Sequence, residues 1–231
     1  MITVAGQIGS GKTEVCNEIG RRTGWRVISA GVIVRRMAAQ RGMSVLEFNE
    51  YAKTHKEIDR EIDGYLASLD SEPESLLIDS RLAWHFLPDS YKVYLVVDPG
   101  VGAERVFRAS RAGENHASRE TASLNIAERQ RLEQERFFSL YSVKPGDWRN
   151  YDLVIDTTYA SPGEVADVIM QRAMAGAPSQ RPECWLSPQR LTASPEAFVF
   201  DGEGDPAAAA GAGQHLVPCQ LAPAEKQPRS R

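Results

Sequence analysis

Short apolar runs alternate with longer amphipathic stretches over about the first 174 residues of the chain. This alternation is typical of βαβ units, in which each strand of a parallel sheet is followed by a helix. The pattern therefore predicts an α/β fold with a five-stranded parallel sheet. The predicted strands cover residues 2–5, 25–29, 75–79, 92–97 and 152–156.

The amphipathic stretches predict seven helices between and after these strands. The start of the last helix is the best marked, because Ser161 can cap it, Pro162 suits its first position and Glu164 completes a capping box. The helix at 118–141 is so rich in charged residues that it is either a solvated face or a mobile lid. The predicted helices cover residues 12–23, 32–41, 45–54, 57–69, 101–111, 118–141 and 162–174.

The sequence GQIGSGKT follows the first predicted strand and precedes the first predicted helix. It satisfies the pattern G-x-x-x-x-G-K-[ST], whose glycines let backbone N–H groups turn inward around a phosphate group. The lysine can bridge the β- and γ-phosphates of ATP, and the final hydroxyl can ligate Mg²⁺. We therefore predict an ATP-binding P-loop, with a glycine-rich turn of another kind as the alternative. Its residues are Gly6, Gln7, Ile8, Gly9, Ser10, Gly11, Lys12 and Thr13.

Two arginines follow the second and third predicted strands. Gly31 and Arg35 have a spacing that places a guanidinium against the phosphate of an acceptor, although Arg35 could also be a surface residue beside Arg36. Asp79 ends an apolar strand in the manner of a Walker B segment, and Arg81 follows it. We expect Asp79 to hold Mg²⁺ and Arg81 to bind the acceptor phosphate; an aspartate that caps the next helix is the alternative.

The polar helix at 118–141 carries Arg129 and Arg136 seven residues apart, with Glu133 between them. This spacing places both arginines near one helix face, where Glu133 can pair with them and orient them. Phosphoryl transfer needs positive charge around the γ-phosphoryl group and exclusion of water. Arginines on a lid would supply both, so we favour the lid over an ordinary solvated charge run.

The segments 29–38, 41–48, 57–63 and 81–83 together resemble the archaeal-type cytidylate kinase family. The similarity continues through 127–136 and ends at 152–157, so it covers about residues 1–174 in the order of the family. The resemblance implies a P-loop NTPase fold, a three-layer α/β/α sandwich with helical acceptor-binding and lid insertions. It also implies a monomeric kinase that transfers phosphate from ATP to CMP or dCMP with Mg²⁺.

Individual roles also follow from this resemblance. Lys12, Arg81, Arg129 and Arg136 match catalytic, phosphate-handling positions. The acceptor site would comprise Gly31, Arg35, Asp59 and Arg81, and the metal site Thr13 and Asp79. The chain departs from the family at Ala30, Val34, Ser80 and Trp84, all of which are expected to border the acceptor pocket.

Residues 175–231 differ in composition from the rest, because eight of the thirteen prolines and the run 207–210 fall there. Segments 185–191 and 198–202 faintly resemble a ParB or sulfiredoxin-type module, but acidic residues replace its phosphate-binding ones. So few apolar residues could hardly form a separate core. We expect a kinase unit at 1–174 and a largely disordered tail at 175–231, with a shortened relic packed on the kinase as the alternative.

Composition narrows the remaining possibilities. The net charge of −4 gives no reason to expect nucleic-acid binding. No stretch approaches the roughly 20 apolar residues of a membrane helix, so we expect a cytoplasmic protein without a membrane partner. Two other functions stay open: a P-loop kinase of another small acceptor, such as AMP or a non-nucleotide, and a regulatory protein that binds nucleotide without transferring phosphate.

Overall fold

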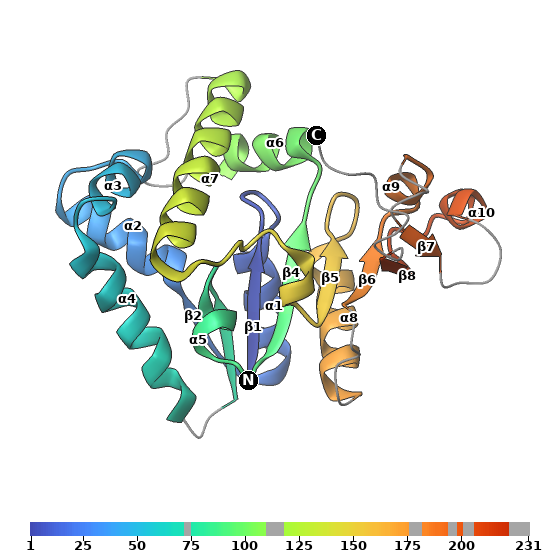
Figure 1. Cartoon of the computed structure of the whole chain (residues 1–231). Coiled ribbons are helices and arrows are strands. Elements are labelled where there is room, and N and C mark those ends of the chain that lie inside the picture. Colours follow the sequence, from blue (N-terminus) through green and yellow to red (C-terminus); the bar gives the residue numbers. More distant parts are fainter. Residues whose placement is uncertain (72–74, 110–117, 176–181, 194–197, 201–205, 222–231) are drawn as a thin grey trace.

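The computed structural model describes residues 1–71, 75–109, 118–175, 182–193, 198–200 and 206–221. Within this part of the chain, all strands belong to one sheet in the order β2-β3-β1-β4-β5-β6-β8-β7 (Figure 1). The five predicted strands are confirmed and lie side by side in parallel. They are β1 (Ile2–Gly6), β2 (Arg26–Ser29), β3 (Leu76–Asp79), β4 (Tyr91–Val96) and β5 (Leu153–Asp156).

The central strand β1 brings the predicted chemistry to one edge of the sheet. It pairs with β3 through Val4 and Asp79 and with β4 through Gly6 and Leu95. The carboxyl ends of parallel strands meet at one edge, which is where α/β proteins bind ligands. The loops after β1, β2 and β3 therefore converge there.

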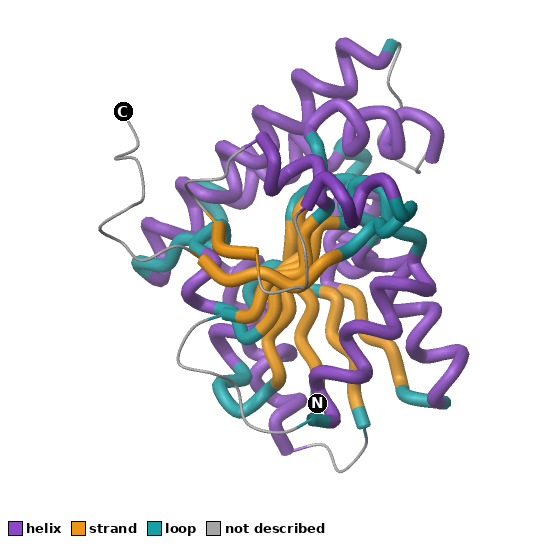
Figure 2. Tube along the Cα trace, turned by 90° about the vertical axis from the view of Figure 1, so that its right-hand side faces the viewer, coloured by secondary structure: helices purple, strands orange, loops and turns teal. Residues whose placement is uncertain are grey.

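Helices cover both faces of the sheet, as the predicted three-layer α/β/α fold requires (Figure 2). On one face, α1 (Lys12–Thr23) and α8 (Pro162–Met174) pack on a cluster that includes Leu77 and Ile155. On the other face, α4 (Lys56–Ser68) and α5 (Ala83–Phe86) cover Ile78. Alternate residues of a strand point to opposite faces, so the apolar run of β3 serves both layers.

Two helical insertions rise beside the carboxyl edge of the sheet. Between β2 and β3 lie α2 (Ala30–Gln40), α3 (Val45–Ala52) and α4, which share a cluster that includes Met37 and Phe48. Between β4 and β5 lie α6 (Pro99–Ala109) and α7 (Arg119–Tyr141). The last two residues of the helix predicted at 101–111 lie outside the described residues.

Helix α7 is anchored by one of its faces rather than solvated all round. Leu132, Glu133 and Phe137 are buried, and the helix contacts both α3 and α6. Ser118 caps its start by accepting a hydrogen bond from Thr121 N. Its buried face is the one that carries the predicted lid arginines.

The segment after residue 175 extends the sheet instead of forming a largely disordered tail. Strand β6 (Glu183–Leu186) pairs in parallel with β5, β8 (Val217–Leu221) pairs antiparallel with β6, and β7 (Phe198–Phe200) pairs antiparallel with β8. The short helices α9 (Pro188–Ala193) and α10 (Pro206–Gly211) accompany them. The sheet thus has eight described strands rather than the five that the sequence predicts.

The extension is stable because it shares the core of the first part of the chain. Cys184, Leu186, Val217 and Cys219 are buried in one cluster with Val154 of β5. A segment too poor in apolar residues for its own core can still fold against an existing strand edge. The division into units at residue 174 stays a prediction, and the acidic residues 201–205 lie outside the described residues. No helix in the described part of the chain is both long and apolar enough to cross a membrane.

Candidate active site

The P-loop turns sharply between β1 and α1 because its three glycines, Gly6, Gly9 and Gly11, adopt positive φ. A side chain at Gly9, where φ is +81°, would place its Cβ 2.4 Å from the carbonyl oxygen of Gly102 on α6. The side chains of Gln7 and Ser10 fix the loop: Gln7 Oε1 accepts from Val97 N at 2.7 Å, and Ser10 Oγ donates to Gln7 O at 2.8 Å. The backbone N–H groups of the same two residues also donate within the protein, to Leu95 O and Gln7 O, so both residues fix the shape of the loop.

Lys12, Thr13 and Asp79 lie together at the start of α1. Lys12 Nζ donates to the carbonyl oxygens of Gly6 and Gln7, at 3.1 and 2.8 Å. Thr13 Oγ1 donates to Asp79 Oδ2 at 2.7 Å, and Ser29 Oγ donates to the same oxygen at 2.9 Å. Asp79 does not cap the next helix; its carboxylate faces the P-loop, as a Walker B residue does.

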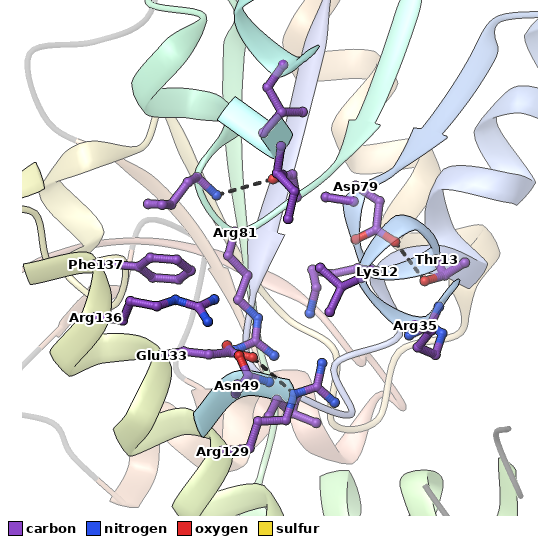
Figure 3. A pocket seen from close by; sticks show the side chains of 18 of the residues that line it. Lys12, Thr13, Arg35, Asn49, Asp79, Arg81, Arg129, Glu133, Arg136 and Phe137 are labelled. Atoms are coloured by element: carbon purple, nitrogen blue, oxygen red, sulfur yellow. Dashed lines mark hydrogen bonds and ion pairs between the residues drawn. The ribbon is translucent and has the colours of Figure 1, made fainter. Parts of the chain in front are cut away.

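A cavity of about 120 Å³ opens in front of Lys12 (Figure 3). Its walls come from the P-loop, α2, α3, α4, the end of β3 and α7. It contains every predicted catalytic, acceptor-binding and metal-binding residue: Lys12, Thr13, Gly31, Arg35, Asp59, Asp79, Arg81, Arg129 and Arg136. Of the remaining P-loop residues, Ile8, Gly9 and Gly11 also line it.

Two of the predicted arginines share one carboxylate in this cavity. Arg81 Nη1 forms an ion pair with Glu133 Oε2, and Arg129 Nε lies 3.0 Å from Glu133 Oε1. Burial, and then the charge of Arg129, lower the pKa of Arg81 to about 9. Arg81 is still protonated at neutral pH, so two cations face the cavity with one anion between them, which favours an anionic ligand.

Arg136 lies deeper in the cavity and pairs with Asp59 rather than with Glu133. Its Nε is 3.5 Å from Asp59 Oδ1, and its guanidinium lies over the ring of Phe137 at 5.3 Å. Within the described residues, Arg136 Nε and Asp59 Oδ2 are buried without a hydrogen-bond partner. Buried polar atoms are normally satisfied, so such a pair is typical of a site that a ligand completes.

Three further polar residues surround this end of the cavity, and none of them has a role predicted from the sequence. Asn49 and Asp63 line it, and Tyr141 donates a hydrogen bond to Asp63 Oδ2. Burial raises the pKa of Asp63 to about 6, against the opposing effect of the Tyr141 hydrogen bond. These three residues lie on three different helices, α3, α4 and α7. Their meeting in one place could be predicted only if the packing of these helices were known.

All but one of the residues expected to border the acceptor pocket line the cavity. Arg35 lines the cavity whereas Arg36 is exposed, and Ala30, Val34 and Ser80 line it too. Trp84 does not border the cavity: it is 8% exposed, and its Nε1 donates to the carbonyl oxygen of Arg81 at 2.9 Å. Its bulk supports the segment behind Arg81 instead of the acceptor pocket.

A sequence model of the cytidylate kinase-like family matches residues 1–159. The chain belongs to this family. It is similar to the cytidylate kinase of Pyrococcus abyssi (strain GE5 / Orsay), with 39% identity over 170 residues, which are 73% of this chain and 91% of the relative. It is also similar to the cytidylate kinase of Thermoplasma volcanium (strain ATCC 51530 / DSM 4299 / JCM 9571 / NBRC 15438 / GSS1), with 34% identity over 176 residues, 74% of this chain and 90% of the relative.

A solved structure shares the fold. It is an uncharacterized protein from Eubacterium ventriosum ATCC 27560, with 16% identity and a TM-score of 0.56, and the match covers 76% of this chain and 98% of that one. The two relatives and the solved structure each match about three quarters of this cytidylate kinase-like protein. The family-model match ends before β6.

A second cavity, of about 220 Å³, lies on the other flank of the P-loop in this member of the family. It is lined by residues 9–11, by Arg105 on α6 and by the loop after β5. Arg105 Nη2 donates to the carbonyl oxygens of Thr157 and Thr158, at 2.7 and 3.2 Å, and its Nη1 lies 3.5 Å from Gly9 O. The sequence gives no sign of this arginine, because it belongs to no recognisable motif.

Proposed function

We propose that this protein transfers the γ-phosphoryl group of ATP to CMP or dCMP. The observation that carries the proposal is the convergence of Arg35, Arg81, Arg129 and Arg136 on one cavity that opens in front of Lys12. A P-loop alone serves many reactions. Four arginines opposite it suit a second phosphate-bearing ligand, and the named relatives supply the identity of that ligand.

In phosphoryl transfer the protein mainly places positive groups around the phosphates, and the P-loop and the arginines of the cavity suit this task. The P-loop N–H groups and the start of α1 would hold the β-phosphate of ATP. Lys12, Arg81 and Arg129 would then surround the group in transfer, where negative charge spreads over its oxygens. Helix α7 would exclude water with the face that already packs in the cavity.

The residues at the P-loop also fit Mg²⁺. Thr13 Oγ1 and Asp79 Oδ2 lie 2.7 Å apart, and Mg²⁺ is usually held by one or two protein oxygens together with water and phosphate oxygens. These two side chains would therefore hold the ion, and Ser29 would orient Asp79. When bound, Mg²⁺ neutralises charge on the phosphates.

The deep end of the cavity suits a cytosine base. Cytosine offers an amino group as donor and ring atoms as acceptors, and Asp59 and Arg136 present the complementary carboxylate and guanidinium. Arg136, which the resemblance assigns to phosphate handling, would thus bind the base instead. Arg35 on α2 would hold the phosphate of the same acceptor. Uracil lacks the amino donor, so a buried carboxylate would disfavour it.

The test is coupled release of ADP from ATP with CMP, dCMP, UMP, AMP and GMP in turn. We expect CMP and dCMP to give the highest kcat/KM. Equal or better turnover with AMP would overturn the cytosine assignment and leave a P-loop kinase of another acceptor. Absence of single-turnover transfer to every monophosphate would instead favour a regulatory protein that only binds nucleotide. The monomeric state and the compartment stay predictions.

A further inference from the structure

The extension after residue 175 is joined to the loop that borders the donor side of the P-loop. Strand β6 lies beside β5, so the turn that follows β6 meets the turn that follows β5 at the carboxyl edge of the sheet. Asp156 is the last residue of β5. Ser187 and Arg190 come directly after β6 and at the end of the first turn of α9.

Asp156 is held from both sides. On the extension side, its Oδ2 accepts hydrogen bonds from Ser187 Oγ and Arg190 Nε, both at 2.8 Å. On the other side, its Oδ1 accepts from Thr158 N at 3.0 Å and from Thr158 Oγ1 at 2.5 Å. Asp156 is 1% exposed and Ser187 is 2% exposed. A carboxylate this deeply buried needs such partners, because an unpaired buried charge is strongly unfavourable.

The loop fixed by Asp156 continues to the P-loop. Thr157 and Thr158 offer their carbonyl oxygens to Arg105, and Thr157 Oγ1 also accepts from Arg105 Nη1 at 3.2 Å. The same Nη1 reaches Gly9 O at 3.5 Å. A continuous set of polar contacts therefore runs from the extension to the donor loop.

We propose that Arg190 and Ser187 are positioning residues for the donor nucleotide. By holding Asp156 they set the loop at 157–160, and this loop sets Arg105 on the wall of the cavity beside the P-loop. Neither residue touches that cavity, so both act through Asp156. The inference rests on the proposed function only in that the P-loop binds ATP.

A purely structural role is the competing explanation, because Arg190 also ties the extension to the sheet. A second ion pair separates the two roles. Arg172 on α8 pairs with Glu183 at the start of β6, at the other end of the strand from Ser187. Removing the charge of Glu183 loosens the same extension but leaves Asp156 with all its partners. Glu183→Gln is therefore the matched control for Arg190→Gln.

The experiment compares the intact chain with Arg190→Gln, Arg190→Lys and Glu183→Gln. Steady-state kinetics give KM for ATP and for CMP separately, and calorimetry gives the affinity for the non-transferring analogue adenosine 5′-(β,γ-imido)triphosphate with Mg²⁺. For Arg190→Gln we expect a rise of about 5- to 20-fold in KM for ATP and in Kd for the analogue, the range of a modest coupling between sites. KM for CMP should stay within about twofold, the limit for a site outside the coupling.

Arg190→Lys should restore part of the ATP affinity, because a lysine can still donate to Asp156. Glu183→Gln should lower Tm without changing KM for ATP. The proposal is overturned if Arg190→Gln leaves ATP affinity unchanged, or if Glu183→Gln weakens it equally. If the wild-type protein transfers phosphate to no monophosphate, the proposed function fails while calorimetry still decides this inference.

Discussion

The acceptor cavity and the surroundings of Asp156 are both built from arginines and carboxylates, yet their polar atoms are satisfied to different degrees. In the cavity, Asp59 Oδ2 and Arg136 Nε are buried without hydrogen-bond partners among the described residues. Around Asp156, each carboxylate oxygen accepts two hydrogen bonds. The first arrangement leaves capacity for a ligand, and the second fixes the backbone.

The comparison predicts that substitutions in the cavity reduce activity with little loss of stability, whereas substitutions around Asp156 reduce both stability and ATP affinity. Lys12→Ala should have the largest effect. It removes the charge that bridges the phosphates, so we expect kcat to fall about a thousandfold or more with little change in Tm. Coupled ADP release and thermal unfolding measure the two quantities. Retained turnover would remove Lys12 from the mechanism.

Arg81→Lys should have the next largest effect. A lysine keeps the charge but cannot form the two-pronged contact of a guanidinium, so kcat/KM for CMP should fall about 100-fold. Arg149→Lys is the control. The Arg149 side chain is 81% exposed, and neither it nor its ion-pair partner Asp147 lines the cavity. Similar losses in both variants would contradict a specific role for Arg81.

Asp156→Ala should destabilise the protein more than any of these cavity substitutions. It leaves Arg190 without its carboxylate in a partly buried place, and we expect the free energy of unfolding to fall by about 3 kcal/mol. Urea unfolding measures it. Asp167→Ala breaks an ion pair between α1 and α8 in which Asp167 is 71% exposed, and it should leave the midpoint nearly unchanged.

Asp63→Asn should have the smallest effect, and that effect should depend on pH. Burial raises the pKa of Asp63 to about 6, above the value of about 3.9 expected in the unfolded chain. The stabilisation from the protonated carboxyl is therefore complete below pH 4 and is lost as pH rises through 6. The amide variant, which can still accept from Tyr141, should escape this loss.

Between pH 4 and pH 7.5, the free energy of unfolding of the wild-type protein should therefore fall relative to that of Asp63→Asn by about 1–2 kcal/mol. Urea unfolding at the two pH values gives the shift. A difference that is independent of pH would show that Asp63 titrates normally.

The sequence predicts the elements whose signals are local. The P-loop, the strand end at Asp79 and the spacing of Arg129 and Arg136 each fit within a few residues, and the structure brings them to one cavity. Asn49 and Asp63 could not be predicted, because they enter the cavity through helix packing rather than through a motif.

The three strands of the extension were not predicted for a related reason. Strands β6, β7 and β8 are only three to five residues long, too short to form a core without a larger sheet to pair with. They are stabilised by pairing with the edge of β5. Because β5 lies outside residues 182–221, the composition of that segment gives no sign of this support. Trp84 is an example of the opposite error. Its size suggested that it borders the acceptor pocket, but its side chain packs in the hydrophobic core.

The position of β6 after β5 and α8 in the chain also bears on the order in which the protein folds during synthesis. Chains fold from the N-terminus as they leave the ribosome, and β1 to β5 with α1 and α8 all precede residue 175. A nascent chain can therefore close its phosphate loop while Asp156 still lacks Ser187 and Arg190. The donor side would therefore mature only after β6 and α9 have docked on β5.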